Sequence, residues 1–128
     1  MAKGSSAVNV PCEDMFGFYK KYLLFIRPLH PVSRLGDQQI DILACLLTKR
    51  FEICKTLKDV HLIGKLLFSL EVRNSIMESL GISSARYYNV VARFRKFGII
   101  EDGDFNKKLL PDLNGGRFSL HLAFVVRC

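Results

Sequence analysis

Tryptophan is absent from this 128-residue sequence, and cysteine and histidine are scarce. The cysteines form no C-x-x-C pair, and the histidines are not spaced as metal ligands with them. This spacing is typical of free thiols in a reducing compartment and argues against a zinc site. We therefore expect no metal, no other cofactor and a cytoplasmic location. The residues are Cys12, Cys45, Cys54, Cys128, His30, His61 and His121.

Long apolar runs are also missing. The first ten residues carry one lysine and no extended apolar segment, so they do not have the pattern of a signal peptide. No uninterrupted apolar stretch approaches the length that crosses a bilayer. We therefore expect no membrane partner.

Catalytic motifs are a third absence. The sequence contains no G-x-S-x-G, no glycine-rich phosphate-binding loop and no H-E-x-x-H. Acidic residues are few and mostly single, and Asp102 and Asp104 straddle an expected turn, where solvated turn carboxylates are a better interpretation than a metal pair. The sequence therefore favours a protein that is not an enzyme.

What the sequence does contain is apolar residues and positive charge. Hydrophobic residues make up 49% of the chain, which is enough for one domain with a single core. The net charge is +7 and the pI about 9.4, a balance compatible with nucleic acid, an anionic surface or an acidic protein partner. The charge is unevenly distributed, since Ser84–Phe97 holds four Arg or Lys residues and no acid.

One stretch of the sequence has the pattern turn, helix, stop, strand. Gly81 can adopt the positive φ that ends one helix, and Ser83 or Ser84 can cap the next. Gly98 is expected to end that second helix, before an extended segment at Ile99–Ile100. Apolar residues inside the helix recur at i, i+3, i+4 and i+7 and form one stripe. The stripe consists of Tyr87, Val90, Val91 and Phe94, and the residues off it include Arg86, Asn89, Arg93 and Lys96.

Earlier segments also predict helices. Ser69 can cap a helix that runs to Leu80, with Glu71 in its first turn, where the helix dipole favours negative charge. Asp37 is a good cap for a helix that runs to about Arg50. The inward residues of that helix are expected to be Ile40, Leu43, Ala44 and Leu47.

Two segments are interpreted from periodicity alone. Met15–Ile26 carries Phe16, Tyr19, Leu23 and Ile26 at helical spacing, as expected for a core or partner-facing stripe. Between Phe51 and Phe68 the pattern is ambiguous. A helix with an apolar end is the preferred interpretation, and a short strand at Lys65–Phe68 is the alternative.

A strand pattern occurs near the C-terminus. Glu101–Asp104 has the composition of a turn. A strand that pairs with Ile99–Ile100 is predicted because one set of residues alternates with another: Phe118, Leu120, Leu122, Phe124 and Val126 alternate with Ser119, His121, Ala123, Val125 and Arg127.

A helix is followed by a Gly-Ile-Ser turn and then by a basic helix, and this order resembles the helix-turn-helix. The Gly-Ile-Ile segment that leads into strands resembles the winged form of that motif. The resemblance covers about Ser69 to Arg127. It implies an α+β, mostly α fold, namely a winged helix-turn-helix with a C-terminal β-hairpin wing and an extra N-terminal helix. The expected division is a polar arm at 1–12, a helical extension at 13–34 and the winged helix domain at 35–128. Met77 departs from the family, which usually has a small residue there.

The resemblance implies binding of double-stranded DNA through the major groove. Arg86 would then contact guanine and Asn89 adenine, while the helix N-terminus at Ser83 or Ser84 would hold a phosphate. The alternatives are solvated charges without a ligand, or a fold used for protein contacts. The full set of expected DNA-binding residues is Ser84, Ala85, Arg86, Tyr88, Asn89, Arg93, Lys96, Lys107, Lys108 and Arg117.

The leading segment has a second resemblance, through Phe18–Leu23, Ile26–Leu29, Leu35 and Ile40–Ala44, to small winged-helix proteins of tailed phages. It implies a regulator, a replication or packaging factor, or a virion component. In the last case the chain would be a structural or assembly adaptor that contacts other protein subunits, located in the host cytoplasm or the virion. Self-association into a homo-oligomer is left open.

Overall fold

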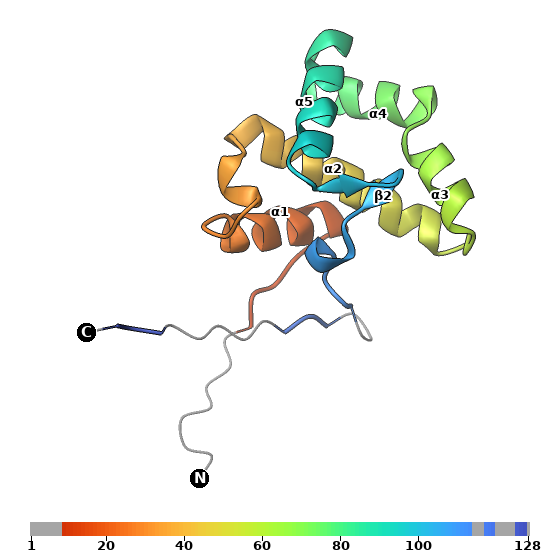
Figure 1. Ribbon diagram of the computed structural model, residues 1–128. Helices are drawn as coiled ribbons and strands as arrows, with labels where there is room; N and C mark the ends of the chain where they lie inside the picture. Colours follow the sequence, from red (N-terminus) through yellow and green to blue (C-terminus); the bar gives the residue numbers. More distant parts are fainter. Residues whose placement is uncertain (1–8, 114–116, 120–124, 128) are drawn as a thin grey trace.

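The computed structural model describes residues 9–113, 117–119 and 125–127, and it is a mostly helical α+β structure (Figure 1). The described part contains five α-helices, one two-stranded antiparallel hairpin and two short 3₁₀ helices. The α-helices are α1 (Met15–Ile26), α2 (Asp37–Cys54), α3 (Val60–Leu67), α4 (Leu70–Leu80) and α5 (Ser84–Lys96). The strands are β1 (Ile100–Glu101) and β2 (Asp104–Phe105), and the 3₁₀ helices are η1 (Val32–Arg34) and η2 (Lys107–Leu109).

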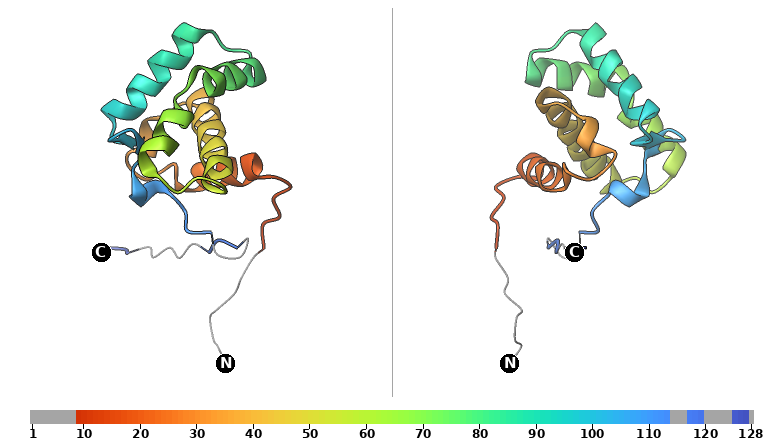
Figure 2. Two further views of the ribbon diagram at one scale, coloured as in Figure 1. Left: turned by 90° about the vertical axis from the view of Figure 1, so that its right-hand side faces the viewer. Right: turned by 60° about the vertical axis from the view of Figure 1, so that its left-hand side comes forward.

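Helix α2 is the centre of the core. It contacts α1, α3, α4 and α5, which lie around it in Figures 1 and 2. A helix surrounded in this way is apolar over more than one face, and α2 buries Ile40, Ile42, Leu43, Ala44, Leu46 and Leu47. Tyr19, Leu23 and Ile26 of α1 belong to the same core cluster. The apolar stripe of α1 therefore packs in the same core as α2.

The predicted helix ends are confirmed. The side chains of Ser69 and Ser83 accept hydrogen bonds from the backbone N–H groups of Val72 and Arg86, so each serine caps its helix. Gly81 ends α4 at φ 65°, and Gly98 follows α5 at φ 76°. At both ends the next residue donates back into the last turn, Ile82 N–H to the Met77 carbonyl and Ile99 N–H to the Phe94 carbonyl. These are Schellman-type ends, which need a left-handed residue.

The start of α2 differs from the prediction. The N-cap residue is Gly36, and its backbone N–H donates to Oε1 of Gln39 at 3.0 Å. Asp37, expected to be the cap, is instead the first residue of the helix. Its carboxylate accepts a hydrogen bond from Arg27 Nη1 at 2.8 Å.

The ambiguous segment between α2 and α4 is helical. α2 extends to Cys54, and α3 begins after Asp59, whose carboxylate accepts from the backbone N–H of His61. The helical interpretation is confirmed, and the alternative of a strand at Lys65–Phe68 is wrong.

The hairpin is more local than the sequence predicted. Ile100 pairs with Phe105 and Glu101 with Asp104 across a tight turn. Asp102 and Gly103 both have positive φ, 53° and 79°, as a two-residue Asp-Gly turn of type I′ requires.

Among the described residues, β1 pairs with β2, whereas the alternating pattern predicts Phe118–Arg127 as its partner. The middle of that predicted strand, residues 120–124, lies outside the described residues, and 118–119 and 125–127 are not in strands. Phe118 packs on α1, with its ring centroid 5.8 Å from that of Phe18 and 5.3 Å from that of Tyr22.

Helix α3 holds the hairpin through a close backbone approach. A Cβ added to Gly64 would lie 2.5 Å from the carbonyl oxygen of Gly103 at the hairpin turn. Only a residue without a side chain fits at this distance, so Gly64 sets how closely α3 approaches the hairpin.

We expect Gly64→Ala to lower the free energy of unfolding by about 1–2 kcal/mol, because the hairpin must shift to admit the methyl group. Alanine by itself favours a helix over glycine by about 1 kcal/mol, so the sign of the change is informative. Urea denaturation measures it. Lys65→Ala, at the exposed neighbouring position, is the control and should change stability by less than about 0.5 kcal/mol. A stabilised Gly64→Ala protein would contradict the close approach.

Candidate nucleic-acid interface

The buried stripe of α5 fixes which of its faces points outward. Tyr87, Val90, Val91 and Phe94 are at most 3% exposed, as the periodicity predicted. The remaining side chains therefore lie on the opposite side of the helix. Those that are exposed are Ser84, Ala85, Tyr88, Asn89, Ala92, Arg93, Arg95 and Lys96, whereas Arg86 is partly buried.

The positive charge of α5 is not neutralised inside the described part of the chain. Ion pairs there join Lys20 to Asp41, Arg27 to Asp37, and Arg50 to Asp104. None of them involves α5, whose own sequence contains no acid. Of the expected DNA-binding residues, seven lie on this helix, and its basic members have no carboxylate partner within the described ranges.

One flank of α5 lies against the start of α2 and η1. Arg86 Nε donates to Oε1 of Gln38. Arg34 and Arg93 both lie over the ring of Phe97, with guanidinium carbons 5.4 and 5.9 Å from its centroid. Arg34 and Gln38 thus join the basic face, although no local motif in the sequence pointed to them.

The other flank of α5 lies against α4. Arg73 Nη1 donates to the hydroxyl of Tyr88 at 2.7 Å, and its guanidinium carbon lies 5.4 Å from the centre of that ring. Tyr88, which was expected to face the ligand freely, is half exposed and held by this contact. Arg95 lies over the ring of Phe68 at 5.6 Å. Arg73 is a second basic residue that the sequence reasoning missed.

The expected wing residues are not at the hairpin. Lys107 and Lys108 lie on η2, which is held against α1 because the Tyr22 hydroxyl donates to the Leu109 carbonyl at 2.9 Å. Figures 1 and 2 show η2 beside α1, far from the start of α5. Arg117 is exposed and adjoins Phe118, whose ring packs on α1. The structure therefore separates these three cations from the seven expected residues of α5.

Asp104 corrects the interpretation of the turn carboxylates. Asp104 is 8% exposed, and its carboxylate forms a bidentate ion pair in which Arg50 Nε and Nη2 donate at 2.7 and 2.9 Å. Desolvation raises the pKa of Asp104, but the hydrogen bonds from Arg50 and from the Phe105 backbone N–H outweigh it, so the pKa is lowered overall. The carboxylate therefore fastens the hairpin to α2, while Asp102 stays exposed.

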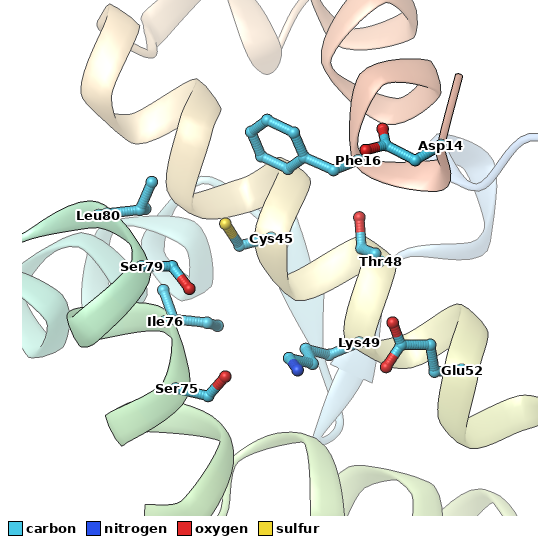
Figure 3. A pocket seen from close by; sticks show the side chains of 10 residues that line it. All are labelled: Asp14, Phe16, Cys45, Thr48, Lys49, Glu52, Ser75, Ile76, Ser79 and Leu80. Carbon is cyan, nitrogen blue, oxygen red and sulfur yellow. The ribbon is translucent and has the colours of Figure 1, made fainter. Parts of the chain in front are cut away.

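A groove of about 370 Å³ lies between α2 and α4, with Phe16 of α1 at one end (Figure 3). Its lining mixes apolar side chains with hydroxyls, Lys49 and Glu52. Burial raises the pKa of the Cys45 thiol to about 11, with Asp41 adding to the effect. The thiol is therefore protonated near neutral pH and is a poor nucleophile.

Comparisons with protein-family models, with curated proteins and with solved structures found no match. Within the described ranges, no helix is both long and apolar enough to cross a membrane. The same residues contain no group of three or more His, Cys, Asp or Glu side chains that could hold a metal ion.

Proposed function

We propose that this chain is a non-catalytic protein that binds double-stranded DNA, with α5 in the major groove. The observation that carries the proposal is the charge of α5, whose outward face and flanks bear Arg86, Arg93, Arg95 and Lys96 and no acid. Phosphate groups along both edges of the groove attract such a face.

An assignment to the winged helix-turn-helix class is part of the proposal. It is supported by the order of the elements, since α4 is followed by the Gly81–Ser83 turn, then by α5 and then by the hairpin. In this assignment α5 is the recognition helix and α2 is the first helix of the domain. Two features differ from that class: α3 stands where a first strand is usual, and the hairpin turn is acidic. We therefore assign the DNA contacts to α5 and its flanks and none to the hairpin turn. A regulator, replication factor or packaging factor of a tailed phage would suit such a module.

The roles follow from position on the helix. Arg86 and Asn89, near the start of α5, are assigned to base edges, where arginine suits guanine and asparagine suits adenine. To contact a base, Arg86 must give up its hydrogen bond to Gln38 and form one to the base instead. Arg93, Lys96 and Arg34 are assigned to the phosphate backbone.

A DNA titration tests the proposal. We expect the logarithm of the association constant for duplex DNA to fall linearly with the logarithm of salt concentration, with a slope of about −3, as the three phosphate contacts assigned to Arg34, Arg93 and Lys96 give. Fluorescence anisotropy of a labelled duplex at several salt concentrations measures the slope. Absence of salt-sensitive binding at low ionic strength would exclude DNA as the ligand.

One observation favours a second candidate, a structural or assembly adaptor. Leu62 and Leu66 are 45% and 49% exposed and lie one turn apart on the same face of α3, and Leu70, the first residue of α4, is 62% exposed. An apolar strip of this kind suits a protein neighbour. In that case duplex binding would be absent, and a partner subunit would cover the strip.

A further inference from the structure

A small pocket lies in the angle between α4 and α5, on the flank of α5 that faces α4. Its volume is about 70 Å³, which is room for a few water-sized groups. Its walls are the side chains of Phe68, Arg73, Tyr87, Tyr88, Val91 and Arg95. It therefore combines two guanidinium groups with three aromatic rings.

The side chain of Tyr87 lines this pocket, and its hydroxyl, which neighbouring side chains cover, has no hydrogen-bond partner among the described residues. Tyr87 is 3% exposed, and its hydroxyl is buried with no hydrogen bond to any described residue. Burial raises the pKa of Tyr87 to about 12, with Tyr88 adding to the rise and the positive charges of Arg95 and Arg73 opposing it. The hydroxyl is therefore a proton donor at neutral pH. Buried donors are nearly always satisfied, so this one calls for an acceptor.

The two arginines retain free donors. Arg73 uses Nε and Nη2 on Oδ1 of Asn74 and one N–H of Nη1 on the Tyr88 hydroxyl. Arg95 has its guanidinium over Phe68 and makes no hydrogen bond to any described residue. Neither arginine forms an ion pair with a carboxylate of the described chain. The pocket thus offers donors from several directions together with two positive charges.

We infer that this pocket binds the oxyanion of a phosphoryl group. A phosphoryl group carries several acceptor oxygens in a tetrahedral arrangement, and arginine forks match that geometry. When the group binds, the side chains that cover the Tyr87 hydroxyl move aside so that it donates to one oxygen, and Arg73 and Arg95 donate to the others. The group comes either from a phosphodiester of bound DNA, a case that rests on the proposed function, or from free phosphate, a case that does not.

Phosphate titration of the full chain tests the site itself. The arginine Nε–Hε signals are followed by NMR as inorganic phosphate is added, with sodium chloride of equal ionic strength as the reference. We expect saturable shifts at Arg73 and Arg95 and none at Arg93, which lies on the opposite flank of α5. Equal shifts in chloride, or shifts spread over all arginines, would overturn the inference.

Tyr87→Phe separates a binding role from a structural one. Removing an unpartnered buried hydroxyl is expected to raise the melting temperature by a few degrees when no phosphate is present. The same change is expected to weaken phosphate binding about tenfold, because the phosphate loses a hydrogen bond to its charged oxygen. Tyr19→Phe, which changes another buried tyrosine outside the pocket, is the matched control and should leave phosphate binding unchanged. A Tyr87→Phe protein that binds phosphate like the parent would refute the site.

Titration with duplex DNA then distinguishes the two sources. If the phosphoryl group is a DNA phosphodiester, both Tyr87→Phe and Arg95→Gln weaken duplex binding, and free phosphate competes with the duplex. If the parent binds phosphate but its duplex affinity is absent or unchanged in Tyr87→Phe, the site takes a free phosphate. The oxyanion site then stands whether or not the DNA proposal does. Both sources would be excluded if the parent showed no saturable phosphate binding and Tyr87→Phe did not change its affinity for the duplex.

Discussion

Replacing Arg86, Arg93 and Lys96 together by glutamine is expected to weaken duplex binding roughly 10²–10³-fold at 0.1 M salt. Each of these residues is assigned to a phosphate or a base, and a phosphate that no longer meets a cation keeps its counterions, which weakens binding. The slope of binding against salt should become shallower by about 2, because two of the three residues, Arg93 and Lys96, are assigned to phosphates. Anisotropy titrations of parent and variant at matched salt concentrations measure both quantities.

The control for this variant has the same net charge in a different place. Lys21, Lys55 and Lys58 are exposed and lie on α1 or beyond the end of α2. Their replacement by glutamine should reduce affinity by less than about tenfold, through the general loss of positive charge alone. Equal losses in the two triple variants would mean that DNA responds only to net charge and does not dock on α5.

Arg50→Met is expected to have the largest effect on stability, a loss of about 3 kcal/mol in the free energy of unfolding. The side chains of Arg50 and Asp104 are only 22% and 12% exposed, so removal of the guanidinium leaves a carboxylate in a poorly solvated place. Methionine keeps much of the aliphatic length, so the loss reports on the ion pair more than on packing. Chemical denaturation at neutral pH measures it.

A second substitution and a pH series check the cause. Adding Asp104→Asn to Arg50→Met should recover more than half of the loss, because the unpaired charge is gone and the amide oxygen still accepts from the Phe105 N–H. The lowered pKa of Asp104 means that the pair stabilises the parent above the ordinary carboxyl pKa and ceases to do so as the pH falls through the folded-state value. The difference between parent and Arg50→Met should therefore shrink below about pH 4. A constant difference would assign the effect to packing.

The helix ends and the buried face of α5 could be predicted from the sequence because their determinants are local. A serine cap or a left-handed glycine acts on N–H and C=O groups within about one turn, so Ser69, Gly81, Ser83 and Gly98 carry their own signal. The stripe through Tyr87 and Phe94 follows from helical periodicity in the same way.

The interactions that shape the candidate interface could not be predicted because their partners are distant in sequence. Arg50 meets Asp104, and Gln38 meets Arg86, only after α2 has been placed in the core. The Asp102–Gly103 turn gives β1 a partner close in sequence, β2, at a low loop-closure cost, whereas the alternating pattern pointed to a more distant segment. That local hairpin leads the chain to η2 on α1 and takes Lys107 and Lys108 away from α5.

Helix α2 restricts which insertions this protein can tolerate. Gln38, near its start, contacts the first turn of α5, and Arg50, near its end, binds the hairpin that follows α5. The two residues are about three helical turns apart, roughly 18 Å. One residue inserted between them would turn Arg50 by about 100° away from Asp104, whereas the connections before and after α3 can change length without moving either contact. The interval between Gln38 and Arg50 is therefore the feature of this chain that divergent relatives should preserve, even where side-chain identity is lost.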